Sequence, residues 1–208
     1  MSGKCSNPHA DLEKSRIPKR FISSTIAGYD TGGHAGKKRA AKLSRAYVDT
    51  FPERKMLGAS LVFCGVPGTG KTHLACAVAI ELIQRGHKAL YSTTYDAVMS
   101  VKSTYGVHSD KTEKEVLDVY RNVELLIIDE VGVQFGTDTE RIIFYQIING
   151  RYENVLPTIL ISNLPEPDLE KYIGGRCLDR LREGAGAVVA FDWESYRRHG
   201  NKNTGRPF

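Results

Sequence analysis

The chain has 208 residues, of which 41% are hydrophobic and 25% are charged, a balance typical of one globular α/β domain. Its longest unbroken apolar stretch, Leu74 to Ile80, is far shorter than the roughly 20 residues that span a bilayer, and the N-terminus has no apolar signal-peptide core. These features argue against a membrane or secreted protein.

The cysteines and histidines also argue against a secreted protein, and they show no pattern of a metal site. The four cysteines form no CxxC pair, and the six histidines show no metal-ligand spacing. Cys64 and Cys76 lie in apolar stretches and are interpreted as small core residues. We therefore expect a reduced, cytoplasmic protein without a metal ion held by protein ligands alone.

The formal net charge of +5 is unevenly distributed. Residues 1–60 contain 12 Lys or Arg and 5 Asp or Glu, residues 61–170 contain 9 and 15, and residues 171–208 contain 8 and 4. A basic head and tail around an acidic middle suggest an anionic partner such as nucleic acid. A solvated basic surface explains the pattern equally well, so both interpretations stay open.

The first fifty residues contain one clear helical pattern. Residues 1–20 are polar and interrupted by two prolines, which indicates a flexible or only locally ordered segment. The glycine-rich segment 28–36 indicates a loop. Residues 37–51 have apolar side chains at helical spacing, and Pro52 is expected to end that helix.

From Ser60 onward, short apolar runs alternate with longer amphipathic segments. The runs predict buried strands at Leu61–Cys64, Ala89–Tyr91, Leu125–Ile128, Thr158–Ile161 and Val188–Phe191. The longer segments predict helices at Lys71–Gln84, Tyr95–Tyr105, Thr112–Tyr120, Asp138–Glu153 and Leu169–Leu181. Buried strands joined by crossover helices indicate an α/β fold with a five-stranded parallel sheet covered by helices on both faces.

The first predicted strand leads directly into an octet that fits the phosphate-loop pattern G-x-x-x-x-G-K-[ST]. The octet consists of Gly65, Val66, Pro67, Gly68, Thr69, Gly70, Lys71 and Thr72. Its glycines allow backbone N–H groups to turn toward phosphate oxygens, and the following helix offers its positive N-terminal end. Lys71 is expected to reach the β- and γ-phosphates and Thr72 to bind Mg²⁺. The octet therefore predicts a nucleotide and Mg²⁺ as cofactors.

A second motif, LLIIDE, places two carboxylates after an apolar strand. Asp129 would lie at the carboxyl end of that strand, where open α/β sheets bind ligands, and would hold Mg²⁺ through water. Glu130 would polarise the attacking water. A glutamate directly after the metal-binding aspartate favours ATP hydrolysis, and the chain has no N-K-x-D motif for guanine.

Four further polar residues come later in the chain. Asn163 would contact the γ-phosphate or orient the water, although a turn explains it as well. Arg176 and Arg180 share one helix face, and an arginine there would act as an arginine finger on a neighbouring subunit's ATP, or form an ordinary cationic surface. Arg197, near the C-terminus, would fold back on the nucleotide.

In this order the motifs resemble those of the AAA+ ATPases of the initiator and helicase-loader clade, and within it the DnaC-like loaders of the DnaC/IstB-type ATP-binding family. The segments GVPGTGKTHLA, LLIIDEVGVQ, GGRCLDRLREG and FDWESYR carry this resemblance, which runs from about residue 17 to residue 196. It implies that Asn163 is sensor 1, Arg180 the arginine finger and Arg197 sensor 2. Because 17 residues follow Phe191, it also implies a reduced lid.

The resemblance further implies a single-stranded DNA site on a helical insert between the second strand and Asp129, here residues 95–120. Lys102 would contact backbone phosphate and Tyr105 would stack on a base, although Tyr105 packing against the sheet explains the sequence as well.

The loaders of this family also carry an N-terminal domain that grips the helicase, but only about 16 residues precede the segment that matches here. The expected division is a flexible segment at 1–20 without that domain, an AAA+ core at 21–191, and a reduced lid and tail at 192–208.

Three functions are compatible with the sequence. The leading one is an AAA+ ATPase of DNA replication that assembles with the finger in trans, binds single-stranded DNA, and loads or remodels the replicative helicase. A second is an IstB-like transposition helper ATPase, which a preference for duplex DNA would indicate. A third is a shortened, non-cycling DNA-binding or regulatory module, which an absence of turnover on any DNA would indicate.

Overall fold

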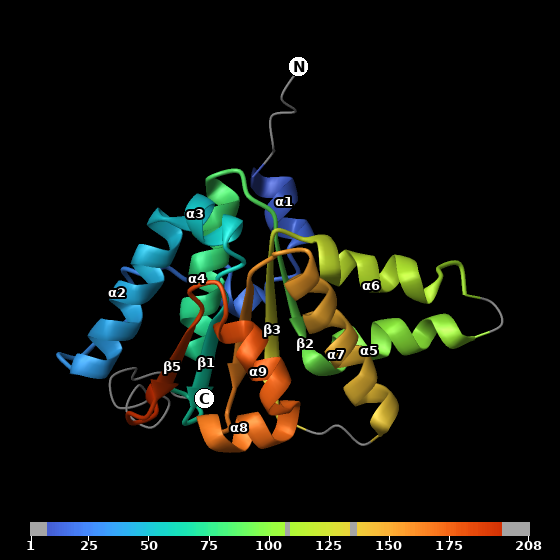
Figure 1. The fold of residues 1–208 in the computed structure, drawn as a ribbon. Coiled ribbons are helices and arrows are strands. Elements are labelled where there is room, and N and C mark those ends of the chain that lie inside the picture. The colour runs from blue at the N-terminus through green and yellow to red at the C-terminus, as the bar shows by residue number, and fades with distance from the viewer. Residues whose placement is uncertain (1–7, 107–108, 134–136, 197–208) are drawn as a thin grey trace, which may run out of the picture.

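A computed structural model of the chain describes residues 8–106, 109–133 and 137–196. Five strands form one parallel sheet in the spatial order β2-β3-β4-β1-β5 (Figure 1). The strands are β1 (Leu61–Gly65), β2 (Ala89–Thr93), β3 (Leu125–Val131), β4 (Thr158–Ser162) and β5 (Ala187–Phe191). The prediction of a five-stranded parallel sheet is confirmed.

Helices connect the strands and cover both faces of the sheet (Figure 1). They are α1 (Pro8–Lys14), α2 (Ala35–Asp49), α3 (Phe51–Met56), α4 (Lys71–Gln84), α5 (Thr94–Lys102), α6 (Glu113–Asn122), α7 (Asp138–Glu153), α8 (Glu166–Ile173) and α9 (Gly175–Arg182), with short 3-10 helices η1 (Lys19–Phe21) and η2 (Ser103–Tyr105). Within the described ranges, no helix has the length and apolar character needed to cross a membrane.

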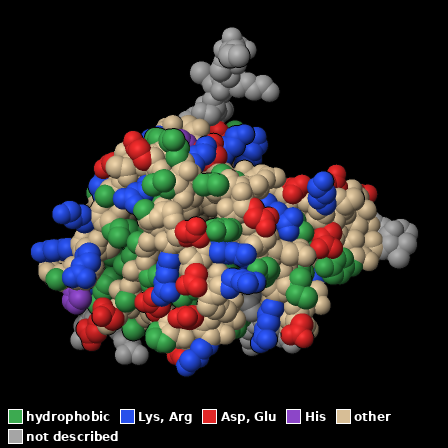
Figure 2. Space-filling model, in the orientation of Figure 1, with side chains coloured by type: hydrophobic (Ala, Val, Ile, Leu, Met, Phe, Trp, Pro, Cys, Tyr) green, Lys and Arg blue, Asp and Glu red, His purple; other side chains and the backbone are tan. Residues whose placement is uncertain are grey.

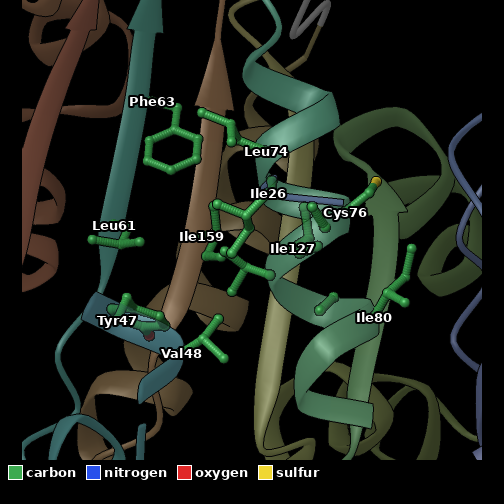
Figure 3. Packing of buried hydrophobic residues seen from close by; sticks show 14 of the residues in the cluster. Ile26, Tyr47, Val48, Leu61, Phe63, Leu74, Cys76, Ile80, Ile127 and Ile159 are labelled. Carbon is green, nitrogen blue, oxygen red and sulfur yellow. The ribbon is translucent and has the colours of Figure 1, made fainter. Parts of the chain in front are cut away.

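The sheet separates two hydrophobic cores because successive strand residues point to opposite faces. In β1, Phe63 faces the core beneath α2 and α4, whereas Val62 faces the core beneath α5, α7 and α9. In β3, Ile127 and Ile128 divide in the same way. Figure 3 shows the first core, in which Phe63 and Ile127 approach side chains of α4 such as Leu74. Because both faces of the sheet are buried, the strands are continuous runs of mainly apolar residues in the sequence.

The buried cysteines belong to these cores. Cys64, Cys76 and Cys177 are free thiols with almost no exposed surface, which confirms the core interpretation of Cys64 and Cys76. Burial raises the pKa of the Cys76 thiol to about 12 and that of Cys64 to about 11, so neither is a reactive thiolate at neutral pH. Cys5 lies outside the described residues.

Two predicted helix boundaries were wrong. The helix expected over 169–181 is two helices, α8 and α9, because Gly174 lies between them with φ +84° and turns the chain. The helix expected to end at Pro52 is α2, which ends earlier, at Asp49. Pro52 instead lies in the first turn of α3, where its missing N–H costs no hydrogen bond.

Residues 8–20, which the sequence assigns to a flexible segment, contain α1 and a strap formed by residues 15–17. The backbone N–H of Tyr91 donates to the carbonyl oxygen of Ser15 (2.7 Å), so the strap pairs with the free edge of β2. Ser15 and Ile17 are buried, and the guanidinium of Arg16 donates to the hydroxyl of Tyr120 on α6 (3.3 Å).

The insert between β2 and β3 projects from one side of the molecule as α5, η2 and α6 (Figure 1). Its second helix begins with a capping box in which Thr112 and Glu115 satisfy each other's backbone N–H groups. The insert therefore presents surfaces that the two cores do not bury.

Candidate nucleotide-binding site

A cleft of about 500 Å³ opens at the carboxyl ends of β1, β3 and β4. It brings together most of the phosphate-loop residues, Asp129, Glu130 and Asn163, which are far apart in the sequence. The N-terminal part of the chain adds further lining residues: Arg20, Phe21, Ser23, Ser24, Gly28, Tyr29, Asp30 and Lys37. The volume suits a ligand of nucleotide size.

The phosphate loop holds its lysine in place. The Lys71 ammonium is buried and donates to the carbonyl oxygens of Gly65 and Val66 (both 2.8 Å). Gly70 has φ +93°, and a Cβ there would lie 2.4 Å from the ring of Tyr29. That crowding and the left-handed backbone explain why this position of the motif needs glycine.

Two aromatic residues from distant parts of the sequence support the loop from outside. The Tyr29 hydroxyl donates to the carbonyl oxygen of Thr69 (2.7 Å), and the indole N–H of Trp193 donates to the same oxygen (3.1 Å). Burial raises the pKa of Tyr29, which keeps its hydroxyl protonated as a donor. Two distant parts of the chain therefore hold the backbone of the loop at Thr69.

The Asp129 carboxylate lies next to the loop and is 6% exposed. One of its oxygens, Oδ2, accepts hydrogen bonds from the hydroxyls of Thr72 and Tyr91 (both 2.9 Å). Asp129 and Thr72 thus offer two hard oxygen donors side by side, the type of ligand that Mg²⁺ requires. The residues present fit a nucleotide-bound Mg²⁺ ion.

A β-bulge directs Glu130 into the cleft. Ile128 pairs with Leu160 and Val131 pairs with Ser162, so β3 uses one more residue than β4 over this stretch. The extra residue leaves Glu130 with φ +60°, and its backbone N–H donates to Oδ1 of Asp129 (2.7 Å). The strained backbone turns the Glu130 side chain away from the buried strand and toward solvent in the cleft.

Asn163 follows β4 and is exposed at the wall of the cleft. The preceding Ser162 is buried and donates to the carbonyl oxygen of Val131 (2.6 Å), which ties the end of β4 to β3. Arg197 lies outside the described residues. The last described residue, Tyr196, donates its backbone N–H to the carbonyl oxygen of Gly68 (2.9 Å), so the chain there lies against the phosphate loop.

Arg180 lies elsewhere, beside a hollow of about 300 Å³ that Ser60 and Thr158 line at the opposite end of the strands. Its guanidinium donates to the hydroxyl of Tyr145 (2.6 Å) and lies 5.2 Å from the ring centroids of both Tyr145 and Tyr152. It does not line the cleft of its own chain, which is the placement that an arginine finger acting in trans requires.

The two predicted DNA residues lie on the insert. Lys102 forms an ion pair with Glu140 (3.3 Å), and Tyr105 is 54% exposed. The alternative that Tyr105 packs against the sheet is therefore wrong. Two large apolar side chains of α5 that the sequence reasoning did not single out, Tyr95 and Met99, are also exposed.

The basic N-terminal part of the chain forms a surface of its own. Lys and Arg side chains gather along the edge of the molecule where α2 lies (Figure 2). Of these residues, Lys38, Arg39 and Lys42 are exposed, and Lys37 lines the cleft. Of the basic residues in the N-terminal part, Arg20 and Lys37 thus line the nucleotide cleft.

Sequence reasoning missed Tyr29 and Tyr91. Tyr91 belongs to β2, which pairs with β3 so that Thr93 lies opposite Asp129. The position of Tyr91 near the end of a predicted buried strand was the available signal for its role. The sequence motifs, however, do not show which strands are neighbours in the sheet. Tyr29 lies in a glycine-rich loop with no pattern of its own.

The described fold and site define a P-loop nucleotide-binding protein. Among solved structures, the DnaC helicase loader superposes with a TM-score of 0.74 at 24% identity, over 83% of this chain and 99% of that chain. A DNA replication initiation factor superposes with a TM-score of 0.67 at 25% identity, over 86% of this chain and 52% of that chain. The fold is therefore that of the AAA+ ATPases, as predicted.

Sequence comparison identifies the family. The family model described as "IstB-like ATP binding protein" matches residues 39–204 of this chain. The replicative helicase loader DnaC of Buchnera aphidicola subsp. Baizongia pistaciae (strain Bp) is 35% identical over 193 residues, which cover 92% of this chain and 77% of that protein. DnaC of Escherichia coli (strain K12) is 38% identical over 162 residues, 78% of this chain and 64% of that protein. The chain belongs to the DnaC/IstB-type ATP-binding family, which confirms the resemblance seen in the sequence motifs.

Proposed function

We propose that this chain is an AAA+ ATPase that hydrolyses ATP with Mg²⁺ and loads or remodels a replicative helicase on single-stranded DNA. The observation that carries the ATPase part is the convergence of the phosphate loop, Asp129, Glu130 and Asn163 on one cleft. Lys71 and the loop N–H groups would bind the phosphates, and Mg²⁺ would shield their charge. Glu130 would polarise water for attack while Asn163 orients it.

The helicase part of the proposal rests on the relatives. The curated proteins that match most of this chain are named replicative helicase loaders. A difference in partner binding between the ATP and ADP states would make the γ-phosphate the switch. Within this proposal, residues 21–191 form the ATPase core and the partner is a replicative helicase.

The DNA part of the proposal rests on the insert. Tyr105 is exposed for stacking, and Lys102, three residues before it on the chain, provides a cation that is paired with Glu140. Aromatic stacking with a nearby basic group is how proteins bind single strands without sequence preference. The exposed cations of α2 would add a second phosphate-binding surface near the cleft.

The family description favours one alternative, an IstB-like transposition helper acting on duplex DNA. ATP hydrolysis measured alone, with oligo(dT) and with a duplex of equal length separates the candidates. Stimulation by oligo(dT), together with ATP-dependent capture of a purified replicative helicase, supports the proposal. Stimulation by duplex alone supports the transposition helper, and no turnover with any DNA or helicase supports the non-cycling module.

A further inference from the structure

We propose that Tyr91 is a positioning residue that holds the Asp129 carboxylate in the orientation that binds the nucleotide's Mg²⁺. The inference rests on the proposed ATP site, but it concerns metal binding and not hydrolysis. Tyr91 belongs to none of the motifs that predict the site. Its hydroxyl nevertheless lies 2.9 Å from Oδ2 of Asp129.

Asp129 is fixed at three of its atoms. Oδ1 accepts the backbone N–H of Glu130 (2.7 Å), and the Asp129 carbonyl oxygen accepts the Thr94 hydroxyl (3.0 Å). The third atom, Oδ2, accepts both Thr72 and Tyr91. Rotation of the carboxylate about its Cα–Cβ bond would break the bonds at Oδ1 and Oδ2 together.

The two donors at Oδ2 differ in what else they must do. The Thr72 hydroxyl is the group that the phosphate-loop motif assigns to Mg²⁺, so it would have two tasks, a lone pair given to the metal and a proton donated to Asp129. Tyr91 carries no such second assignment. Of the two described donors to Oδ2, the Tyr91 hydroxyl is thus the one whose described role is confined to the carboxylate. An ionised carboxylate has about four lone-pair sites, so Asp129 can accept the bonds at Oδ1 and Oδ2 and still accept one from a metal-bound water.

Tyr91 is itself held rigidly. Its side chain is 8% exposed in the core beneath α4, and its backbone N–H donates to Ser15 of the strap. Groups that orient a metal's ligands commonly change metal affinity 10- to 100-fold when they are removed.

The test is Tyr91→Phe, which removes only the hydroxyl, with binding of a fluorescent ATP analogue measured over a Mg²⁺ titration. We expect the Mg²⁺ midpoint to rise by about 10-fold, whereas binding in EDTA is unchanged. Tyr47→Phe is the matched control, because Tyr47 is 3% exposed and donates to the Ala59 carbonyl oxygen (2.8 Å) at the other end of the sheet. Its Mg²⁺ midpoint should equal that of the wild type.

A second measurement separates positioning from a general loss of stability. In an Asp129→Asn background, Tyr91→Phe should shift the Mg²⁺ midpoint no further, because both changes act on the same carboxylate. An unchanged midpoint in Tyr91→Phe, an equal shift in Tyr47→Phe, or a wild type without Mg²⁺-dependent binding would each overturn the inference. A wild type that binds Mg²⁺ and ATP without hydrolysing it would instead overturn the proposed function alone.

Discussion

At the scale of single residues, the cleft combines a motif with a backbone distortion. The phosphate-loop octet predicts Lys71 and Thr72 directly, since each residue type at its place in the motif has one chemical task. Glu130 is different: its exposure to the cleft depends on the bulge in β3 and on a backbone φ of +60°. Asp129 and Glu130 are neighbours in sequence, yet one is buried against the loop and the other faces solvent.

Glu130→Gln tests the role of that exposed carboxylate. We expect ATP hydrolysis to fall by about 100-fold or more, because an amide cannot accept the water's proton, whereas ATP binding is unchanged. Steady-state turnover and binding of a fluorescent ATP analogue measure the two effects. Glu53→Gln, on the exposed surface of α3, is the control and should leave both unchanged. Equal turnover in Glu130→Gln and the wild type would remove the general-base assignment.

At the scale of elements, ion pairs outside the cleft tie the helices to the sheet. Lys55 of α3 and His87, before β2, both contact Oε2 of Glu124, the residue before β3, at 2.8 and 2.9 Å. Burial opposes the charge of Glu124, but the hydrogen bonds from Lys55 and His87 outweigh it and lower the pKa of this carboxyl. The cluster fixes the starts of two strands at the end of the sheet opposite the cleft.

Glu124→Gln should lower the free energy of unfolding by about 1–2 kcal/mol at pH 7, since it weakens hydrogen bonds to a charged group. The folded-state pKa of Glu124 lies below the unfolded value, so its stabilisation is present above pH 4.5 and is lost as the pH falls through the folded pKa. Urea unfolding of both proteins between pH 7 and pH 3 checks this. A difference that stays constant over that range contradicts the assignment.

The insert between β2 and β3 carries the DNA-binding surface in the proposed function. Tyr105→Ala should weaken binding of labelled oligo(dT) by about 5- to 100-fold, the range expected when one aromatic stack is removed. Fluorescence anisotropy at a fixed salt concentration measures the change. Val119→Ala, on the exposed face of α6 in the same insert, is the matched control. If both variants bind DNA as the wild type does, DNA binds elsewhere.

At the scale of the whole molecule, the nucleotide cleft and Arg180 lie at opposite ends of the strands. One chain therefore does not complete its own site with this arginine. The proposed solution is head-to-tail assembly, in which Arg180 of one protomer reaches the cleft of the next. Tyr145 and Tyr152 hold the guanidinium at the surface where that contact would form.

Mixing two inactive variants tests this assembly. Arg180→Ala and Glu130→Gln should each be inactive alone, whereas an equimolar mixture should recover part of the wild-type turnover. The recovery follows because an intact cleft of one variant meets an intact finger of the other. Arg176→Ala, one turn earlier on α9 and exposed, should remain active by itself. Full activity of Arg180→Ala alone would remove the finger assignment.

Much of the fold was predictable because each element has a local pattern. The bounds of α4 and α7 match the predicted ranges, and the five apolar runs are the five strands. The errors arose where one residue type has two uses: Pro52 can end a helix or begin one, and Gly174 can sit within a helical pattern or break it. Tertiary packing decides between these uses, and a local pattern does not contain it.

The sequence by itself determined the class of fold, the phosphate loop, the pair of carboxylates and the family, because these depend on residue type and spacing along the chain. Only the tertiary structure decided which strands are neighbours, and therefore that Tyr91 reaches Asp129 and that Tyr29 supports the loop. It also decided that Arg180 lies away from its own cleft. Contacts between residues far apart in sequence depend on strand order and register. Burial of both sheet faces selects that order and register, and this burial exists only when the whole chain is folded.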